Sequence, residues 1–145
     1  MKKMMFLSVF IAALFLAVSS LSAAESPAGK WKTICDETGE AKSIVEIKVE
    51  NGNLTGTIIE LLQEKDDAVC DKCRGKFKDQ RIVGMEFIWD MKKDGNEYSG
   101  GRILDPGNGR EYRCRLWREG DELHVRGFIG ISLAGRTQVW QRIGD

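Results

Sequence analysis

Four cysteines and one histidine are the residues of this chain with the most specific chemistry. The cysteines are Cys35, Cys70, Cys73 and Cys114, and the histidine is His124. Two of the cysteines form a Cys70-Asp-Lys-Cys73 motif, whose spacing suits thiol redox chemistry or half of a zinc site. Redox motifs of this kind usually begin a helix beside a βαβ unit, whereas this one lies in a charged loop between predicted strands. The sequence therefore favours a structural disulfide, with a redox pair as the alternative.

The pairing of the four cysteines stays open, because four cysteines allow three connectivities and spacing does not choose among them. Cys35 and Cys114 are candidates to bond with each other or to remain as buried thiols. A zinc site at Cys70 and Cys73 would need them or His124 as further ligands. We predict that Cys114 points inward and His124 outward, so these groups do not converge. We expect no metal site and no cofactor.

His124 is also a weak candidate for catalysis, since no serine or cysteine nucleophile is predicted beside it. We expect no catalytic residue and no enzymatic activity. Eight arginines lie between residues 102 and 142, but acidic residues are interspersed among them and so predict cross-strand ion pairs. Arg102 and Arg136 are the exceptions, because each adjoins a glycine where a ligand or another backbone segment can approach closely.

The N-terminal sequence predicts the cellular compartment of the protein. Lys2 and Lys3 precede an apolar run and then a cluster of small residues that ends at Ala24. This order is typical of a secretory signal peptide over residues 1–24, with cleavage before Glu25. We therefore expect a periplasmic or secreted protein with no transmembrane anchor after the signal is removed. Residues 25–145 suit one domain.

Charge excludes some partners. Without the two N-terminal lysines, the remaining chain carries a small excess of acidic over basic residues, and both signs are interspersed. This balance argues against nucleic acid as a partner and against electrostatic docking on an anionic membrane.

Alternating apolar and polar residues, rather than a helical period, dominate the chain after Pro27. Turn sequences such as Glu50-Asn-Gly-Asn53 and Asp105-Pro-Gly-Asn-Gly109 separate the alternating segments. The predicted strands are 30–35, 43–49, 54–62, 81–91, 97–104, 110–118, 123–130 and 136–143. These features predict an all-β fold, an antiparallel meander of about eight strands that closes as a small barrel, with a sandwich as the alternative. Closure is favoured because it leaves no exposed strand edge.

Strict alternation assigns each side chain to one face of its strand. The residues predicted to face inward are Val45, Ile47, Val49, Val83, Met85, Phe87, Trp89, Met91, Tyr112, Cys114, Leu116, Leu123, Val125, Gly127 and Ile129. Gly127 leaves room among them, and Gly130 and Gly135 bracket a predicted corner before the last strand. An interior of this kind either fills with side chains or holds one small ligand.

Several stretches resemble a family of bacterial secreted proteins known as domain of unknown function 2147. They are "GKWKTI", "SIVEI", "YSGGRILDPGNGREYRC" and "LHVRGFIGISLAGRTQVWQR". The resemblance implies a periplasmic or secreted β protein of no assigned activity. The segments "AGKWK" and "ENGNLTGTIIE" are similar, more weakly, to the opening of lipocalin-like and avidin-like barrels, which hold small apolar or amphipathic ligands.

Three functional hypotheses follow. The first is a non-enzymatic barrel that binds a small apolar or amphipathic ligand, with Phe87, Trp89, Arg102, Tyr112, Gly127 and Arg136 as candidate binding residues. The second is an interaction module of the cell envelope with a filled core and an exposed apolar surface at Ile88, Trp117 and Phe128. The third is a thiol-active protein that uses Cys70 and Cys73.

Overall fold

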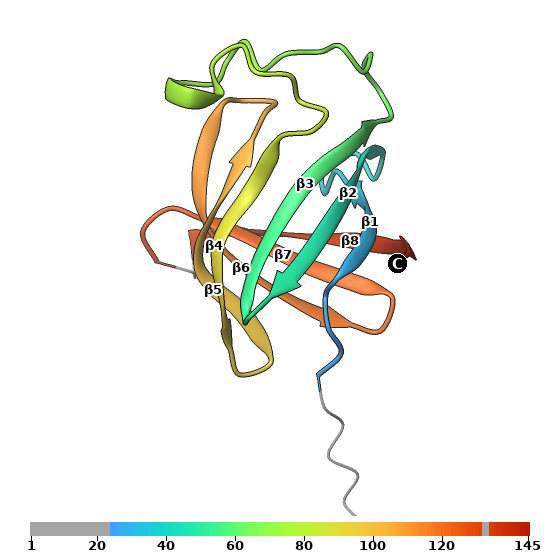
Figure 1. The fold of residues 1–145 in the computed structure, drawn as a ribbon, viewed down its shortest axis with the longest axis vertical. Helices are drawn as coiled ribbons and strands as arrows, with labels where there is room; N and C mark the ends of the chain where they lie inside the picture. The colour runs from blue at the N-terminus through green and yellow to red at the C-terminus, as the bar shows by residue number, and fades with distance from the viewer. Residues whose placement is uncertain (1–23, 132–133) are drawn as a thin grey trace, which may run out of the picture.

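The protein is an eight-stranded antiparallel β-barrel, as seen in a computed structural model that describes residues 24–131 and 134–145 (Figure 1). Each strand pairs with the next along the chain, and the last pairs with the first, which closes the barrel. The strands are β1 (Gly29–Ile34), β2 (Ala41–Glu50), β3 (Asn53–Leu61), β4 (Glu86–Asp94), β5 (Glu97–Asp105), β6 (Arg110–Glu119), β7 (Glu122–Phe128) and β8 (Arg136–Gly144). The predicted fold class is confirmed. The predicted signal peptide lies outside the described residues, apart from its last residue.

Tight turns make the meander possible. Asn51 and Gly52 both adopt positive φ (51° and 75°) between β2 and β3, the conformation that matches the twist of a hairpin. Because the strands are antiparallel, alternate connections share an end of the barrel. The connections β1–β2, β3–β4, β5–β6 and β7–β8 lie at one end, which we call the open end. The turns β2–β3, β4–β5 and β6–β7 lie at the other, which we call the packed end.

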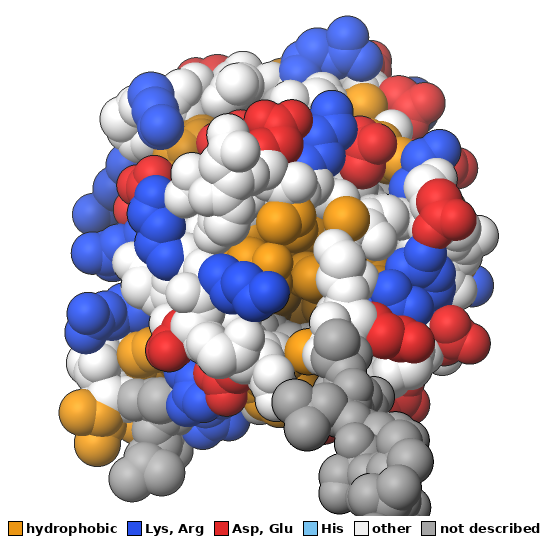
Figure 2. All heavy atoms as spheres, turned by 60° about the horizontal axis from the view of Figure 1, so that its bottom comes forward, with side chains coloured by type: hydrophobic (Ala, Val, Ile, Leu, Met, Phe, Trp, Pro, Cys, Tyr) orange, Lys and Arg blue, Asp and Glu red, His pale blue; other side chains and the backbone are white. Residues whose placement is uncertain are grey.

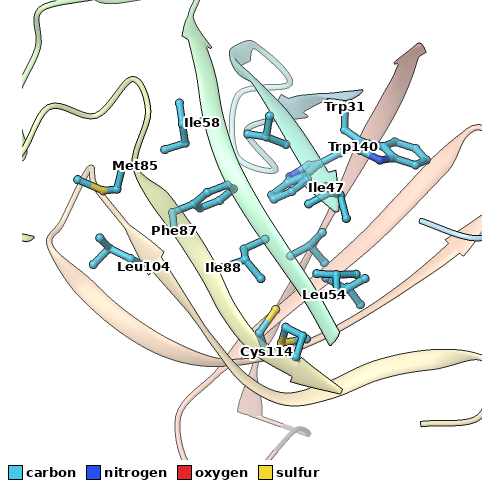
Figure 3. Close-up of a cluster of buried hydrophobic side chains, with 14 of the residues drawn as sticks. Trp31, Ile47, Leu54, Ile58, Met85, Phe87, Ile88, Leu104, Cys114 and Trp140 are labelled. Carbon is cyan, nitrogen blue, oxygen red and sulfur yellow. The ribbon is translucent and has the colours of Figure 1, made fainter. Parts of the chain in front are cut away.

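Apolar side chains fill the packed end. Its most deeply buried members include Leu54, Met91, Cys114, Leu116 and Leu123, each less than 2% exposed. Part of this cluster is drawn in Figure 3, with Leu54 and Cys114 near its lower edge. Their inward orientation follows the alternation of the sequence, so most of the predicted core is confirmed.

Trp31 belongs to the same core and is fully buried. Its indole Nε1–H donates to the carbonyl oxygen of Pro27 at 2.9 Å, which satisfies its only polar group. The guanidinium groups of Arg118 and Arg142 lie 5.7 and 5.6 Å from its ring centre. These cation–π contacts join β1, β6 and β8 around one aromatic ring.

Strand β4 departs from the predicted alternation. It begins at Glu86 rather than Arg81, and its register against β3 shifts twice around Gly56. Such β-bulges insert extra residues, so neighbouring side chains no longer alternate strictly. Phe87 and Ile88 are consequently both buried, and Trp89 moves to the outer face. The predictions of an inward Trp89 and an exposed Ile88 are therefore wrong.

The long β3–β4 connection runs across the open end of the barrel and packs against the β5–β6 turn (Figure 1), where Lys72 Nζ donates to the carbonyl oxygen of Gly107 at 3.2 Å. It contains a short 3-10 helix, η1 (Gly75–Phe77), whose Phe77 ring lies 5.3 Å from the ring of Trp89. The Cys70–Cys73 disulfide lies in the same connection, and both cysteines are buried. Gly109 makes this packing possible, because a Cβ there would lie 2.0 Å from the carbonyl oxygen of Lys72.

The outside of the barrel is polar and mixed in charge. Figure 2 shows lysine, arginine, aspartate and glutamate side chains intermixed over one face, with hydrophobic side chains visible between them. None of the helical segments in the described part of the chain is both long and apolar enough to cross a bilayer.

Candidate functional site

A cavity of about 540 Å³ occupies the open end of the barrel. All four connections at this end contribute to its wall, and so do the adjoining halves of the strands. The barrel interior is thus divided along its axis, since the packed end is filled and the open end is hollow.

Aromatic and aliphatic side chains form the deep part of the cavity. The rings of Phe87 and Trp140 lie with their centres 6.1 Å apart and their planes inclined by 29°, and Figure 3 shows the two side chains extending from different strands. Both residues are buried, and both line the cavity together with Ile58, Ile103 and Val125. An apolar surface of this kind removes apolar ligand area from water.

A chain of hydrogen bonds runs along one wall of the cavity, from Trp140 at the floor to Arg136 at the rim. Trp140 Nε1–H donates to Gln138 Oε1 at 2.9 Å, and Gln138 Nε2 donates to Asp36 Oδ1 at 3.3 Å. Asp36 Oδ2 then accepts from Arg136 Nε at 3.0 Å. Glu37 also pairs with Arg136 at 3.1 Å. These bonds tie the β1–β2 connection to β8.

The contacts along this wall determine the pKa of Asp36. Burial alone would raise the pKa of its carboxyl group, but the hydrogen bonds and the charge of Arg136 outweigh burial and hold that pKa below its usual value. Asp36 in turn raises the pKa of Arg136, with a smaller effect from Glu37. Asp36 and Arg136 are therefore a fixed ion pair at neutral pH.

The neighbouring strand β6 carries a second polar group of the cavity. The Tyr112 hydroxyl accepts a hydrogen bond from Asn108 Nδ2 at 3.0 Å. Gly127 lies next to Tyr112, and a Cβ added there would sit 3.5 Å from Tyr112 Cβ in ordinary contact. The missing side chain of Gly127 thus enlarges the cavity beside the tyrosine, which agrees with the role predicted for this glycine.

The rim is partly apolar. Ile129 lines the cavity, yet 65% of its surface is exposed, and Ile131 in the same connection is 67% exposed. The prediction that Ile129 belongs to the interior is therefore wrong. Strand β7 ends at Phe128, so Ile129 lies in the loop at the mouth, where strand alternation no longer applies.

The six predicted binding residues divide into two groups. Phe87, Tyr112, Gly127 and Arg136 line the cavity. Trp89 and Arg102 do not: they pair with each other across β4 and β5 on the outer face, where Arg102 is exposed. The bulges in β4 explain the position of Trp89. Arg102 is a sequence candidate because it adjoins Gly101, but a Cβ at Gly101 would clash with the backbone oxygen of Trp89, so the glycine serves the close approach of another backbone segment and not of a ligand.

Sequence reasoning missed Asp36, Gln138 and Trp140 as cavity residues. Gln138 and Trp140 share the parity of Arg136 on β8, so alternation could have placed them together. Asp36 lies in a connection with no periodic signal, and nothing in its local sequence predicts its contact with a residue 100 positions away.

The cysteines play different roles. Cys70 and Cys73 form the local disulfide, whereas Cys35 and Cys114 are separate buried thiols. Burial raises the pKa of Cys114 to about 12. The pKa of Cys35 is lowered, first by hydrogen bonding with the side chain of Thr38 and then with the backbone of Thr38 and Glu37. Cys35 follows β1 at the open end, and Cys114 belongs to the packed core.

Comparison with known protein families assigns the chain to one of them. A family model described as "Uncharacterized protein conserved in bacteria (DUF2147)" matches residues 29–142, which include all eight strands almost completely. The chain belongs to the DUF2147 family. A search of curated proteins finds no match to it.

A solved structure shares the fold of this DUF2147 protein. Protein HP1028 from the human pathogen Helicobacter pylori, described as belonging to the lipocalin family, superimposes with a TM-score of 0.71. The two sequences are 20% identical, and the match covers 83% of this chain and 84% of the other. The similarity supports a lipocalin-like barrel, as the sequence predicted.

Proposed function

We propose that this protein binds a small apolar or amphipathic ligand in the cavity at the open end of its barrel and does so without catalysis. The observation that carries the proposal is the cavity itself, whose volume of about 540 Å³ lies within the range of small-molecule sites. Lipocalin-like architecture is compatible with this role.

The distribution of polar groups favours an amphipathic ligand. The stacked rings of Phe87 and Trp140 lie at the apolar floor, and the charged pair of Asp36 and Arg136 lies on the wall above. A ligand with an apolar body and a polar end would bury the body against the rings and leave the polar end beside the ion pair. The exposed Ile129 extends apolar contact to the mouth.

The chemistry of the wall supports binding rather than catalysis. Gln138 and Asp36 bond to neighbouring protein groups, and Trp140 and Arg136 complete the same chain. Among the residues that the structure describes, the histidine lies on the outer face of β7 and not in the cavity. The buried Cys70–Cys73 disulfide supports a stapled loop and an oxidising compartment, in line with a periplasmic or secreted location.

A fluorescent apolar probe such as N-phenyl-1-naphthylamine tests the proposal. We expect saturable binding by the wild-type protein, with one probe per chain and quenching of tryptophan emission through Trp140. Gly127→Val adds a side chain inside the cavity, where a Cβ makes only ordinary contacts, so it should weaken probe binding at least tenfold without unfolding the barrel.

Arg102→Gln is the matched control, because it changes an exposed residue on the outer face of the same barrel. It should leave probe affinity unchanged. Equal affinity of Gly127→Val and Arg102→Gln would place the probe outside the cavity and contradict the proposal. Native mass spectrometry of protein purified from its own host adds an independent measurement, and a co-purified small amphiphile that Gly127→Val lacks is the expected result.

A further inference from the structure

The outer face of the β6–β7 hairpin brings together three groups that neither the fold nor the cavity uses. Glu119 ends β6 and Glu122 begins β7, and the two residues are paired across the turn. His124 follows two positions later on the same face, opposite Trp117. One ligand atom from each of Glu119, Glu122 and His124 lies within 4.8 Å of the others.

We propose that these three side chains form a binding site for a divalent transition-metal ion of the zinc class. The proposal is independent of ligand binding in the cavity, since the hairpin lies at the packed end. An imidazole nitrogen with two carboxylate oxygens is a donor set that suits Zn²⁺, Ni²⁺ and Cu²⁺ better than Mg²⁺ or Ca²⁺, which prefer all-oxygen sites.

Two of the three separations between the ligand atoms match a metal site, and the third, between the two glutamate oxygens, is within 4.8 Å. His124 Nε2 lies 3.4 Å from Glu119 Oε2 and 3.3 Å from Glu122 Oε2. Ligands bound tetrahedrally at Zn²⁺ distances of about 2.0–2.2 Å are separated from one another by about 3.3–3.6 Å. A metal ion can therefore be held by these three atoms with only small side-chain adjustments, and solvent can complete its coordination.

The environment of the His124 Nε2 atom also favours a bound metal ion. Its Nε2 atom is buried, and it has no hydrogen-bond partner among the described residues despite its closeness to both carboxylates. A buried nitrogen that makes no hydrogen bond is costly even beside two carboxylates, and binding to a metal ion would satisfy it. The carboxylates are the exposed members of the cluster, so the ion could reach the nitrogen from their side.

Trp117 holds the donors in position. Its ring stacks on His124 with centres 5.2 Å apart and planes 12° apart, which fixes the imidazole orientation. Its indole Nε1–H donates to Glu119 Oε1 at 3.0 Å, which leaves Oε2 of the same carboxylate facing His124. Hydrogen bonds of this kind to metal ligands orient them and strengthen binding.

An ion would also relieve repulsion between the carboxylates. Glu119 and Glu122 are opposite each other in the strand register, and like charges in that position destabilise a hairpin. A simple ion pair of protonated His124 with the two glutamates would relieve the same repulsion without a metal. The two explanations differ in their response to Zn²⁺, because a metal site binds one ion per chain and a simple ion pair binds none.

Isothermal titration with ZnCl₂ at pH 7.5 tests the proposal, on untagged protein that carries Cys35→Ser so that no thiol of the open end competes. We expect one ion per chain with a dissociation constant in the micromolar range. His124→Gln should weaken Zn²⁺ binding at least 50-fold and Glu122→Gln about tenfold. Glu111→Gln changes an exposed glutamate on the same strand, β6, outside the cluster, and should have no effect.

Tryptophan emission gives a second measurement that reports position. Cu²⁺ quenches nearby indoles, so it should quench wild-type emission through Trp117, and Trp117→Phe should remove most of that quenching. Binding of Zn²⁺ weaker than millimolar, or equal binding by His124→Gln and Glu111→Gln, would overturn the proposal. Zn²⁺ should not change the affinity of the protein for the apolar probe. The absence of binding at the hairpin or in the cavity would therefore not affect the measurement at the other site.

Discussion

The two ends of this barrel are built from the same strands but differ in what fills them. At the packed end, side chains such as Leu54, Leu116 and Leu123 are fully buried, and two guanidinium groups make cation–π contacts with Trp31. At the open end, the same strands surround a cavity of about 540 Å³. Stability and binding are therefore separated along the barrel axis.

The difference arises from residue size at matched positions. On β7, Leu123 and Val125 fill the inner face near the packed end, and Gly127 continues that face into the cavity without a side chain. On β8, Trp140 closes the floor, whereas Gln138 and Arg136 replace apolar side chains with polar ones. At the open end of this barrel, hydrogen bonds along the wall thus take the place of apolar core packing.

The two free thiols give the sharpest contrast between the ends. Burial raises the pKa of Cys114 to about 12, whereas hydrogen bonding with Thr38 lowers that of Cys35. At pH 8 only about one Cys114 in ten thousand is ionised, and the thiolate is the reactive form. In the folded protein, iodoacetamide should therefore modify Cys35 more than 100-fold faster than Cys114, as measured by peptide mass spectrometry.

Unfolding in urea provides the control, because it should bring the two thiols to similar rates. Rapid modification of Cys114 in the folded protein would mean that the packed end opens readily, and the contrast between the ends would then fail.

Truncation should also separate the two ends. Leu54→Ala removes a fully buried side chain from the packed end and should cost about 2–5 kcal/mol in the free energy of unfolding. Ile103→Ala removes a partly buried side chain that lines the cavity, where water already has access. We expect a loss of less than about 1.5 kcal/mol there, measured by urea denaturation. Equal losses would indicate that the cavity wall is as tightly packed as the core.

Most of the barrel could be predicted from the sequence, because alternation and turn residues act locally. Seven of the predicted strands agree with the structure to within a residue or two at each end. Strand β4 was placed five residues too early. The alternating pattern 83–91 runs through Gly84 and into two bulges: the first turns Ile88 inward and Trp89 outward, and the second returns Met91 to the interior.

The site was less predictable, because it depends on contacts between distant segments. Asp36 meets Arg136 only after the barrel has closed, and no pattern around either residue encodes the pairing. The hairpin cluster is different: the two-residue turn Gly120-Asp121 places Glu119, Glu122 and His124 on one face, so strand register predicts their proximity. The partners that strand register offers to His124 are these adjacent carboxylates and not the distant cysteines.

Two glycines at the open end test which positions need a missing side chain. A Cβ at Gly135 would lie 2.5 Å from the backbone oxygen of Gly127, so Gly135→Ala requires a backbone shift and should cost about 1–3 kcal/mol. Gly127→Ala adds a Cβ that makes only ordinary contacts, and we expect a change of less than about 0.5 kcal/mol. Thermal unfolding of both variants checks the difference. A reversed order would mean that the cavity beside Tyr112 is closed.

The polar wall of the open end should contribute the smallest effect, and that effect should depend on pH. The pKa of Asp36 is held below its usual value in the folded protein, so its ion pair with Arg136 stabilises the fold above the unfolded pKa of about 4. This contribution should be constant between pH 5 and 7, and it should be lost as the pH falls through the folded pKa.

The variant Asp36→Asn tests this dependence, because it lacks a carboxyl group that can titrate. The difference in urea midpoint between wild type and Asp36→Asn should therefore shrink below pH 4, and 1 M NaCl should shrink it at pH 7 because the pair is partly exposed. A difference that grows on acidification would mean that burial, and not Arg136, dominates the energetics of Asp36.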